Sequence, residues 1–267
     1  MDEELMSFSV EQAFSLKGKV AMITGANHGL GEAYAVALAK AGADIFITHH
    51  SPDVTRVRAE IESLGRRVAF CQGDLTQAEH REACIAGCLH EFGRIDILVN
   101  NAGRNHAAPL LDFEDEDWKK VVDLQMEAVH YLSRAAAGVM AKQGGGKIIN
   151  IASALSFAAD PNACAYTAAK HAIIGITRSF AAELGRYHIN CNAIAPGFFL
   201  SNMTDSIRAA NPKLYERVGE RIPLSEDGSW GNIRDLMGAI VFFAAPASDY
   251  ITGDVLVVDG GFKAQMI

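Results

Sequence analysis

Short apolar runs alternate with helix-period segments along almost the whole chain, and this alternation limits the fold more than any other feature. Each run has few polar interruptions, which is typical of a strand buried on both faces of a sheet. Such strands form parallel sheets covered by helices on both sides, so we predict one α/β domain. The predicted strands are residues 19–24, 43–48, 68–71, 95–99, 148–151, 189–194 and 255–258.

The segments between these strands carry the helical pattern, and two of them are long. We expect one helix over 117–142, capped by Asp117, and another over 165–186. Residues 1–17 are predicted to be a short arm, and 198–230 an irregular lid over a substrate, with a helix near 211–220. No repeat or linker divides the chain, so residues 1–267 are read as one domain. The other predicted helices end near residue 40 or cover 53–64, 77–92 and 233–244.

Three glycines lie between the first predicted strand and the helix that follows it. Gly25 permits a tight turn, Gly29 allows backbone to approach a pyrophosphate, and Gly31 lets the helix pack close to the strand. The helix N-terminus then offers free amides and a positive dipole end to phosphates. The pattern predicts a doubly wound, Rossmann-type dinucleotide site, although glycines at these positions also suit a plain turn.

A second cluster of functional residues is predicted around Tyr166 and Lys170, which are four residues apart on one helix face. We expect the Lys170 ammonium to lower the pKa of the Tyr166 phenol toward neutrality, as a proton-transferring group requires. Ser153 follows a predicted strand and is expected to hydrogen-bond a substrate oxygen. Taken alone, a Tyr-x-x-x-Lys pair also fits a solvated helix face.

Composition excludes several classes of protein. The net charge of −8 argues against a nucleic-acid or anionic-membrane surface. The longest apolar runs are too short to span a membrane, and the acidic N-terminus does not resemble a signal peptide. Five cysteines without a Cys-x-x-Cys pair favour buried thiols in a reducing cytoplasm, and no metal site is predicted.

Four motifs in this order resemble the short-chain dehydrogenase/reductase family. They are the turn 24–31, Asn100-Asn-Ala-Gly103, Ser153 and Tyr166-x-x-x-Lys170, and the resemblance extends from about residue 16 to 261. It implies reversible hydride transfer between a nicotinamide and a secondary alcohol or ketone. Tyr166 is then the general acid/base, Lys170 holds the nicotinamide ribose and Ser153 orients the substrate.

The same resemblance implies which residues bind NAD(P). Asp74 matches the position that hydrogen-bonds adenine, and the turn after residue 100 passes close to the ribose. The full predicted set is Gly25, Asn27, His28, Gly29, Leu30, Gly31, His49, His50, Asp74, Leu75, Asn101, Ala102, Gly103, Tyr166, Lys170, Pro196, Gly197 and Phe199.

Two positions depart from the family pattern. Gln125 stands where members usually carry a catalytic Asn that anchors a water, and its extra methylene displaces the amide. His49 stands where an acidic residue would bind the ribose hydroxyls and repel a 2′-phosphate. The missing carboxylate favours NADP slightly over NAD, although no Arg or Lys is available nearby.

Within the family, the chain is most similar to the gluconate 5-dehydrogenase and 2-deoxygluconate 3-dehydrogenase group. A sugar acid or polyol is therefore the expected substrate, and Arg104 is the expected partner of a carboxylate. Apolar residues 198–200 suit a larger hydrophobic ketone, such as a steroid, equally well. A dinucleotide-binding sensor without turnover is the alternative from another class. The predicted substrate contacts are Arg104, Asn105, His106, Ala154, Leu155 and Phe198.

Association is predicted from the two long helices. Small and apolar residues such as 135–138 and 168–169 leave outer faces that suit packing against a second copy. The resemblance also implies a dimer or tetramer, so we expect a homo-oligomer.

Overall fold

Seven parallel strands form one sheet in the order β3-β2-β1-β4-β5-β6-β7. The computed structural model describes residues 7–201, 204, 208–209 and 211–265. Every strand lies within two residues of a predicted one at each end, and the predicted single-domain α/β fold is confirmed. The strands are β1 (Val20–Thr24), β2 (Asp44–His49), β3 (Val68–Gln72), β4 (Ile97–Asn100), β5 (Gly146–Ile151), β6 (Ile189–Pro196) and β7 (Val255–Val258).

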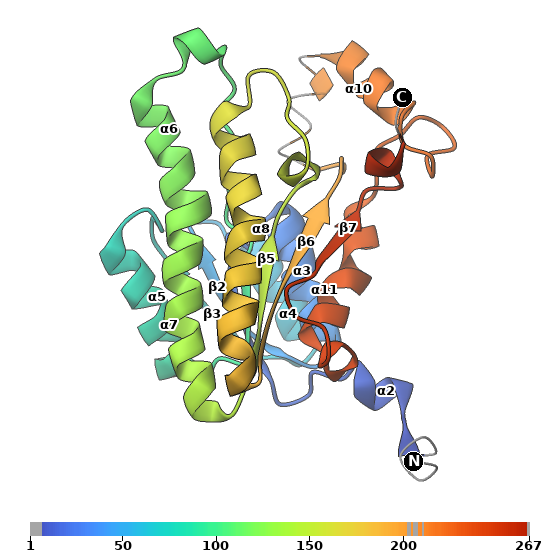
Figure 1. Ribbon diagram of the computed structural model, residues 1–267. Helices are drawn as coiled ribbons and strands as arrows, with labels where there is room; N and C mark the ends of the chain where they lie inside the picture. Colours follow the sequence, from blue (N-terminus) through green and yellow to red (C-terminus); the bar gives the residue numbers. More distant parts are fainter. Residues whose placement is uncertain (1–6, 202–203, 205–207, 210, 266–267) are drawn as a thin grey trace.

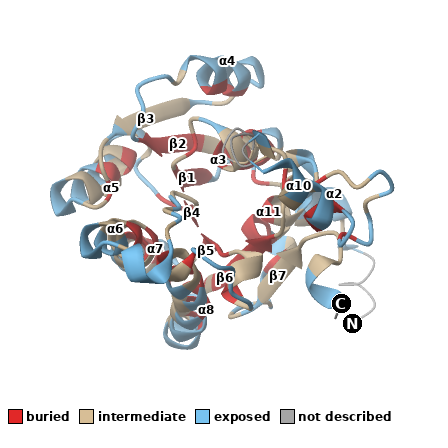
Figure 2. Ribbon diagram, turned by 90° about the horizontal axis from the view of Figure 1, so that it is seen from above, coloured by how far each residue is buried: buried red, intermediate tan, exposed pale blue. Residues whose placement is uncertain are grey.

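Helices cover both faces of the sheet (Figures 1 and 2). Leu38 of α3 and Ile240 of α11 belong to the apolar core on one face, and Cys88 of α5 and Leu132 of α7 to the core on the other. The first layer contains α3 (Gly29–Lys40), α4 (Thr55–Ser63) and α11 (Met237–Ala244), and the second α5 (Ala78–Phe92), α7 (Ala128–Gln143) and α8 (Cys164–Leu184). None of the described helices is long and apolar enough to cross a membrane.

The strand order reverses between β1 and β4, which are neighbours in the sheet. β1 connects outward to β2 on one side, and β4 connects outward to β5 on the other. Loops at the carboxyl ends of these strands therefore diverge and leave a crevice, where ligands of open α/β sheets bind. This topology places the glycine-rich turn beside the loop that follows β4.

The long predicted helix differs from the expectation in its start and its interior. It begins as α6 (Asp115–Val122), and the N-cap residue Glu114 makes no side-chain capping bond. Asp117 therefore lies inside the first turn and is not the cap. A π-helical segment, η2 (Asp123–Glu127), then joins α6 to α7. Residues Ile233–Leu236 likewise form a 3₁₀ turn before α11.

Two outlying segments frame the domain. The N-terminal arm contains a short helix, α2 (Val10–Ala13), and Phe14 beyond it contacts Phe242 of α11 with ring centroids 6.3 Å apart. In the lid region, α10 (Pro212–Gly219) rests on an aromatic cluster that includes Phe198 and Trp230. The lid residues 202–203, 205–207 and 210 lie outside the described part of the chain.

Candidate active site

A cavity of about 710 Å³ opens at the carboxyl edge of the sheet. Its walls come from the loops that follow β1 to β6 and from the helices α6 and α8. Residues from the glycine-rich turn and from the predicted Ser153, Tyr166 and Lys170 set line the same space. The topology therefore joins the two clusters that the sequence separates by more than a hundred residues.

The glycine-rich turn is closely packed at two positions. Gly25 has a φ of 62°, and a Cβ there would lie 3.0 Å from the Cα of Ala102. A Cβ on Gly31 would lie 2.4 Å from the carbonyl oxygen of Gly25, so only glycine lets α3 start this close to β1. Gly29 has a φ of 62° with open space around it. These are the three properties a pyrophosphate cradle at a helix N-terminus requires.

Hydrogen bonds fix this turn to the loop that follows β4. The Thr24 hydroxyl accepts from the backbone amides of Asn101 and Ala102, both at 2.9 Å. The Asn101 side chain donates to the carbonyl oxygens of Thr24 and Gly25 at 2.9 and 3.0 Å. Asn100 points away and bonds Asn150 and Ser133 in the core. These bonds fix the conformation of the glycine-rich turn before any ligand binds.

The end of β2 holds the residues expected to contact the adenosine ribose. His49 is buried, and its Nδ1 lies 2.7 Å from the carbonyl oxygen of Ser51. The Asn27 side chain donates to the Ser51 hydroxyl at 2.7 Å and to the Asp53 carbonyl at 3.1 Å. The Asp53 carboxylate accepts from the amide of Thr55 at 3.0 Å and does not line the cavity. No carboxylate of the described residues therefore enters the cavity at this strand end.

Asp74 follows β3 and is the only Asp or Glu among the described residues that line the cavity. Burial opposes its charged form, but hydrogen bonds from Thr76 outweigh that effect and hold the pKa of Asp74 below its usual value. The Thr76 amide donates to the Asp74 carboxylate at 2.9 Å. The side chain is thereby a fixed, ionised acceptor, as recognition of an adenine amino group requires.

Ser153, Tyr166 and Lys170 converge from two elements, the loop after β5 and the helix α8. Ser153 follows β5 and caps the 3₁₀ turn Ala154–Ser156, with its hydroxyl accepting from the Leu155 amide at 3.1 Å. Lys170 is buried in α8, and its Nζ donates to the carbonyl of Ile151 at 2.8 Å. The same Nζ lies 5.5 Å from the centroid of the Tyr166 ring.

The electrostatics of this group differ from the expectation. Burial raises the pKa of Tyr166 above its usual value, although a hydrogen bond with Ser153 opposes the shift. Burial also lowers the pKa of Lys170 to about 8. The expectation that the Lys170 ammonium lowers the pKa of the Tyr166 phenol is wrong for this arrangement, because the desolvation of Tyr166 dominates. At neutral pH the hydroxyl is therefore protonated and able to act as an acid.

Gln125 lies in the π-helical segment and is buried beneath the loop that follows β4. Its Nε2 donates to the carbonyl of Arg104 at 2.8 Å. Its Oε1 is buried and has no hydrogen-bond partner among the described residues. A Cβ on Gly103 would lie 2.8 Å from that oxygen. The longer amide thus ties the cavity loop directly to the helix.

All predicted catalytic and cofactor residues line the cavity, and so do Arg104 and Asn105. The other four predicted substrate contacts are not among its lining residues. Phe198 packs on Trp230 with ring centroids 5.0 Å apart, and His106 bonds Asp117 at 3.3 Å. Ala154 and Leu155 form the turn after Ser153. Within the described residues, no group of His, Cys, Asp or Glu is suited to a metal ion.

Ten further residues line the cavity that sequence reasoning did not select. Most are neighbours of the motifs, and spacing along a strand would have found them. Lys120 and Leu124 could have been identified from helical spacing, because they are four residues apart in the helical segment that also contains Gln125. The ten are Thr48, Ser51, Gly73, Thr76, Lys120, Leu124, Ile151, Ala152, Ser201 and Thr204.

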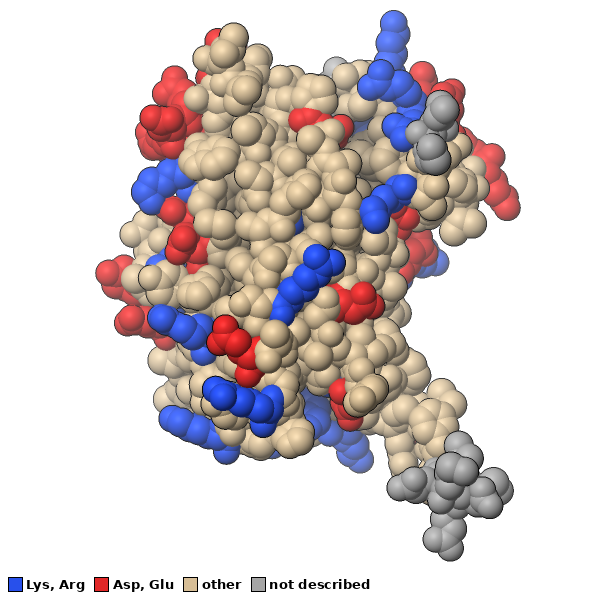
Figure 3. Space-filling view, viewed as in Figure 1, with Lys and Arg blue, Asp and Glu red and all other residues tan. Residues whose placement is uncertain are grey.

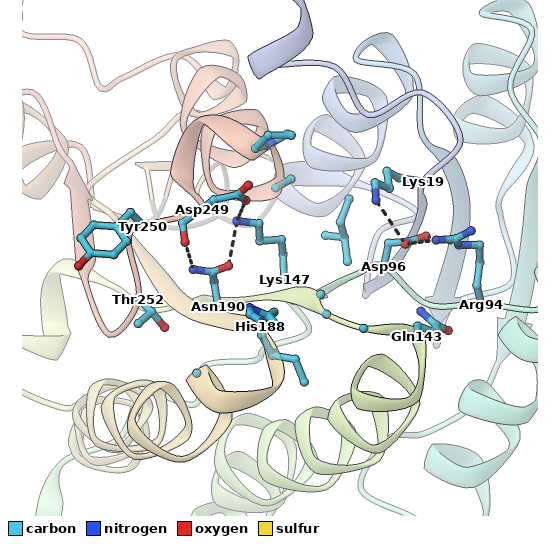
Figure 4. A pocket seen from close by; sticks show the side chains of 18 residues that line it. Lys19, Arg94, Asp96, Gln143, Lys147, His188, Asn190, Asp249, Tyr250 and Thr252 are labelled. Atoms are coloured by element: carbon cyan, nitrogen blue, oxygen red, sulfur yellow. Dashed lines mark hydrogen bonds and ion pairs between the residues drawn. The ribbon is translucent and has the colours of Figure 1, made fainter. Parts of the chain in front are cut away.

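A second cavity of about 700 Å³ lies near the amino ends of β4, β5 and β6 (Figure 4). Asp96 there accepts from Arg94 at 2.6 and 2.7 Å and from the backbone amide of Val20 at 2.9 Å. Lys147 is held by Asp249 at 2.7 Å and Asn190 at 2.9 Å. These charges already have partners, so this edge of the sheet is a structural ion-pair network.

Comparisons with known proteins agree with this geometry. A family model described as Enoyl-(Acyl carrier protein) reductase matches residues 25–263. The chain is 44% identical to 2-dehydro-3-deoxy-D-gluconate 5-dehydrogenase of Escherichia coli K12, over 95% of this chain and 98% of that protein. It is 45% identical to the uncharacterized oxidoreductase YgcW of the same organism, over 98% and 99%.

A solved structure gives the same result. Gluconate 5-dehydrogenase from Burkholderia cenocepacia J2315, in complex with NADP and tartrate, superposes with a TM-score of 0.90 at 33% identity and covers 97% of this chain and 100% of that one. The predicted resemblance is thereby confirmed over nearly the full length. The chain belongs to the short-chain dehydrogenase/reductase family and is an NAD(P)-dependent oxidoreductase that acts on CH–OH groups.

Proposed function

We propose that this enzyme interconverts a secondary alcohol and a ketone of a sugar acid, with Tyr166 as the general acid/base. This proposal rests on the observation that Ser153, Tyr166 and Lys170 line the same cavity as the glycine-rich turn. Relatives named for gluconate and 2-dehydro-3-deoxy-D-gluconate support this substrate class over a hydrophobic ketone.

The residues divide the chemistry between them. The nicotinamide supplies or accepts the hydride when it is bound. In the reductive direction the Tyr166 hydroxyl donates its proton to the carbonyl oxygen as the C–H bond forms, and in oxidation the phenolate takes that proton back. Ser153 donates a hydrogen bond to the same oxygen and stabilises its developing charge. The buried Lys170 ammonium binds the hydroxyls of the nicotinamide ribose.

The proposed cofactor is NADP. Support comes from the absence of a carboxylate among the described cavity residues at the end of β2, since a carboxylate there would repel a 2′-phosphate. His49 and His50 occupy that position and carry imidazole donors. The Burkholderia relative was solved with NADP.

The test is a spectrophotometric screen with the purified enzyme. D-gluconate, sugar keto acids, diketones and keto-steroids are offered with both NAD and NADP couples. We expect turnover of a sugar acid, a higher kcat/KM with the NADP couple, and a loss of about 10³-fold in Tyr166→Phe with dinucleotide binding retained. Full activity of that variant, or turnover of keto-steroids alone, would refute the assignment.

We further propose a cytoplasmic homo-oligomer that associates through α7 and α8. Tyr131 on α7 is 40% exposed, and the face shown in Figure 3 carries broad uncharged areas between scattered charged side chains. The five cysteines are free thiols, as suits a reducing compartment. Light scattering that gives only a 28.7 kDa species would contradict association.

A further inference from the structure

The end of the cavity next to Ser153 and Tyr166 is bordered by two cations that the proposed reaction does not use. Arg104 follows β4 and is exposed, and Lys120 of α6 is partly buried. Among the described residues, the only carboxylate lining the cavity is Asp74, which follows β3 at the adenosine end. In a chain of net charge −8, this end of the cavity is thus lined by two cations and, among the described residues, by no carboxylate.

The packing of α6 on α8 determines where Lys120 lies. Val121 forms a small buried cluster with Ala165 and Ala169, which are the chain neighbours of Tyr166 and Lys170. Lys120 therefore lies level with the turn of α8 that carries the catalytic pair. Leu124, one helical turn further on, also lines the cavity, so α6 presents this face to the bound substrate.

Lys120 retains hydrogen-bonding capacity. Its ammonium lies 2.8 Å from a Glu116 oxygen and 3.4 Å from an Asp117 oxygen, and a third N–H remains without a partner among the described residues. The Glu116 side chain is 78% exposed, so this ion pair is weak. The hydrogen bond to Glu116 raises the pKa of Lys120, which stays charged at neutral pH.

Arg104 has its backbone fixed and its side chain free. The carbonyl of Arg104 accepts from Gln125 at 2.8 Å, which holds this residue against the π-helical segment. Its guanidinium makes no hydrogen bond, ion pair or ring contact with another described residue. A guanidinium that has no other partner, on a backbone held in place, is suited to bind a carboxylate.

We propose that Lys120 is a specificity-determining residue, which together with Arg104 binds the substrate carboxylate while Tyr166 and Ser153 hold the reacting oxygen. This inference rests on the proposed sugar-acid substrate. In this arrangement the two cations bind the carboxylate end of the sugar acid, and the carbon that reacts lies nearer to α8. A sugar acid is thereby favoured over a polyol of the same length.

The test compares D-gluconate with D-glucitol, which carries a hydroxymethyl group in place of the carboxylate. The measured quantity is the ratio of kcat/KM for the two substrates. We expect Lys120→Met to lower this ratio about tenfold, as loss of one charge-assisted hydrogen bond predicts. Lys120→Glu lowers it further, and Lys120→Arg keeps it within about threefold of the wild type.

The matched control is Lys119→Met. Lys119 is 71% exposed, pairs with Asp123 and does not line the cavity, so its ratio should equal that of the wild type. Equal ratios in the Lys119→Met and Lys120→Met variants would overturn the role of Lys120 and leave the sugar-acid activity standing. Wild-type turnover of D-glucitol without any turnover of gluconate or keto acids would overturn the substrate class and this inference together.

Discussion

At the scale of single residues, burial changes the chemistry that the motif alone suggests. A Tyr-x-x-x-Lys spacing predicts convergence, and the structure brings Lys170 Nζ to 5.5 Å from the Tyr166 ring centroid. The spacing cannot predict that desolvation raises the pKa of the Tyr166 phenol, because this desolvation depends on side chains contributed by other elements. Both groups are consequently protonated at neutral pH, which is the state from which Tyr166 can donate a proton in carbonyl reduction.

This protonation state predicts a pH profile for reduction. The pKa of Lys170 is lowered to about 8 by burial, so its charge is present below that pH and lost above it. Initial-rate kcat/KM for ketone reduction should stay level to about pH 7.5 and fall above pH 8. Lys170→Arg, which keeps its charge to higher pH, should lower the rate but move the fall upward. A wild-type profile that is level to pH 10 would show that Lys170 does not titrate in this range.

At the scale of elements, the sequence predicts which strands and helices exist and in what order, but it does not predict local departures from regular helix geometry. Near-continuous apolar runs predict all seven strands, because the five inner strands are buried on both faces and the edge strands β3 and β7 are partly buried. The π-helical segment at Asp123–Glu127 leaves no such trace. Within this segment Gln125 donates to the carbonyl of Arg104, twenty-one residues earlier, and a contact between separate segments has no local signature in the sequence. The substrate contacts expected after Ser153 do not line the cavity, because Ala154 and Leu155 belong to a 3₁₀ turn that the Ser153 hydroxyl caps.

The contact between this segment and the cavity loop predicts a coupled pair of substitutions. Gly103 does not require a positive φ, so Gly103→Ala acts only through its Cβ, which would lie 2.8 Å from Gln125 Oε1. We expect it to raise KM for substrate and dinucleotide about tenfold, and to do so much less in a Gln125→Asn background, where the side chain is shorter. Gly238→Ala on α11 is the control, because this position is exposed and its Cβ meets nothing within 4 Å. Additive effects in the double mutant would show that the two side chains do not interact.

At the scale of the whole molecule, the two edges of the sheet have separate tasks. The carboxyl edge carries glycines, uncapped amides and the cavity residues. The amino edge carries paired charges, among which Asp96 contacts Arg94 and Lys19 and accepts from the amide of Val20 (Figure 4). The four-residue β4 separates these edges by about 13 Å at the usual rise per residue. Stability and activity should therefore be separable by substitution at the amino edge.

Asp96→Ala tests this separation. It removes the acceptor of the buried Val20 amide and the partner of Arg94, which should cost about 2 kcal/mol of unfolding free energy. For a chain of 267 residues that corresponds to a fall in Tm of about 4 °C. The KM values for substrate and dinucleotide, measured well below Tm, should not change, because the carboxylate lies at the opposite end of β4 from the cavity. Asp112→Ala, at an exposed position, should change neither quantity. A rise in the dinucleotide KM of Asp96→Ala would mean that strain at the amino edge reaches the cradle through β1 and β4, and the two edges would then form one cooperative unit.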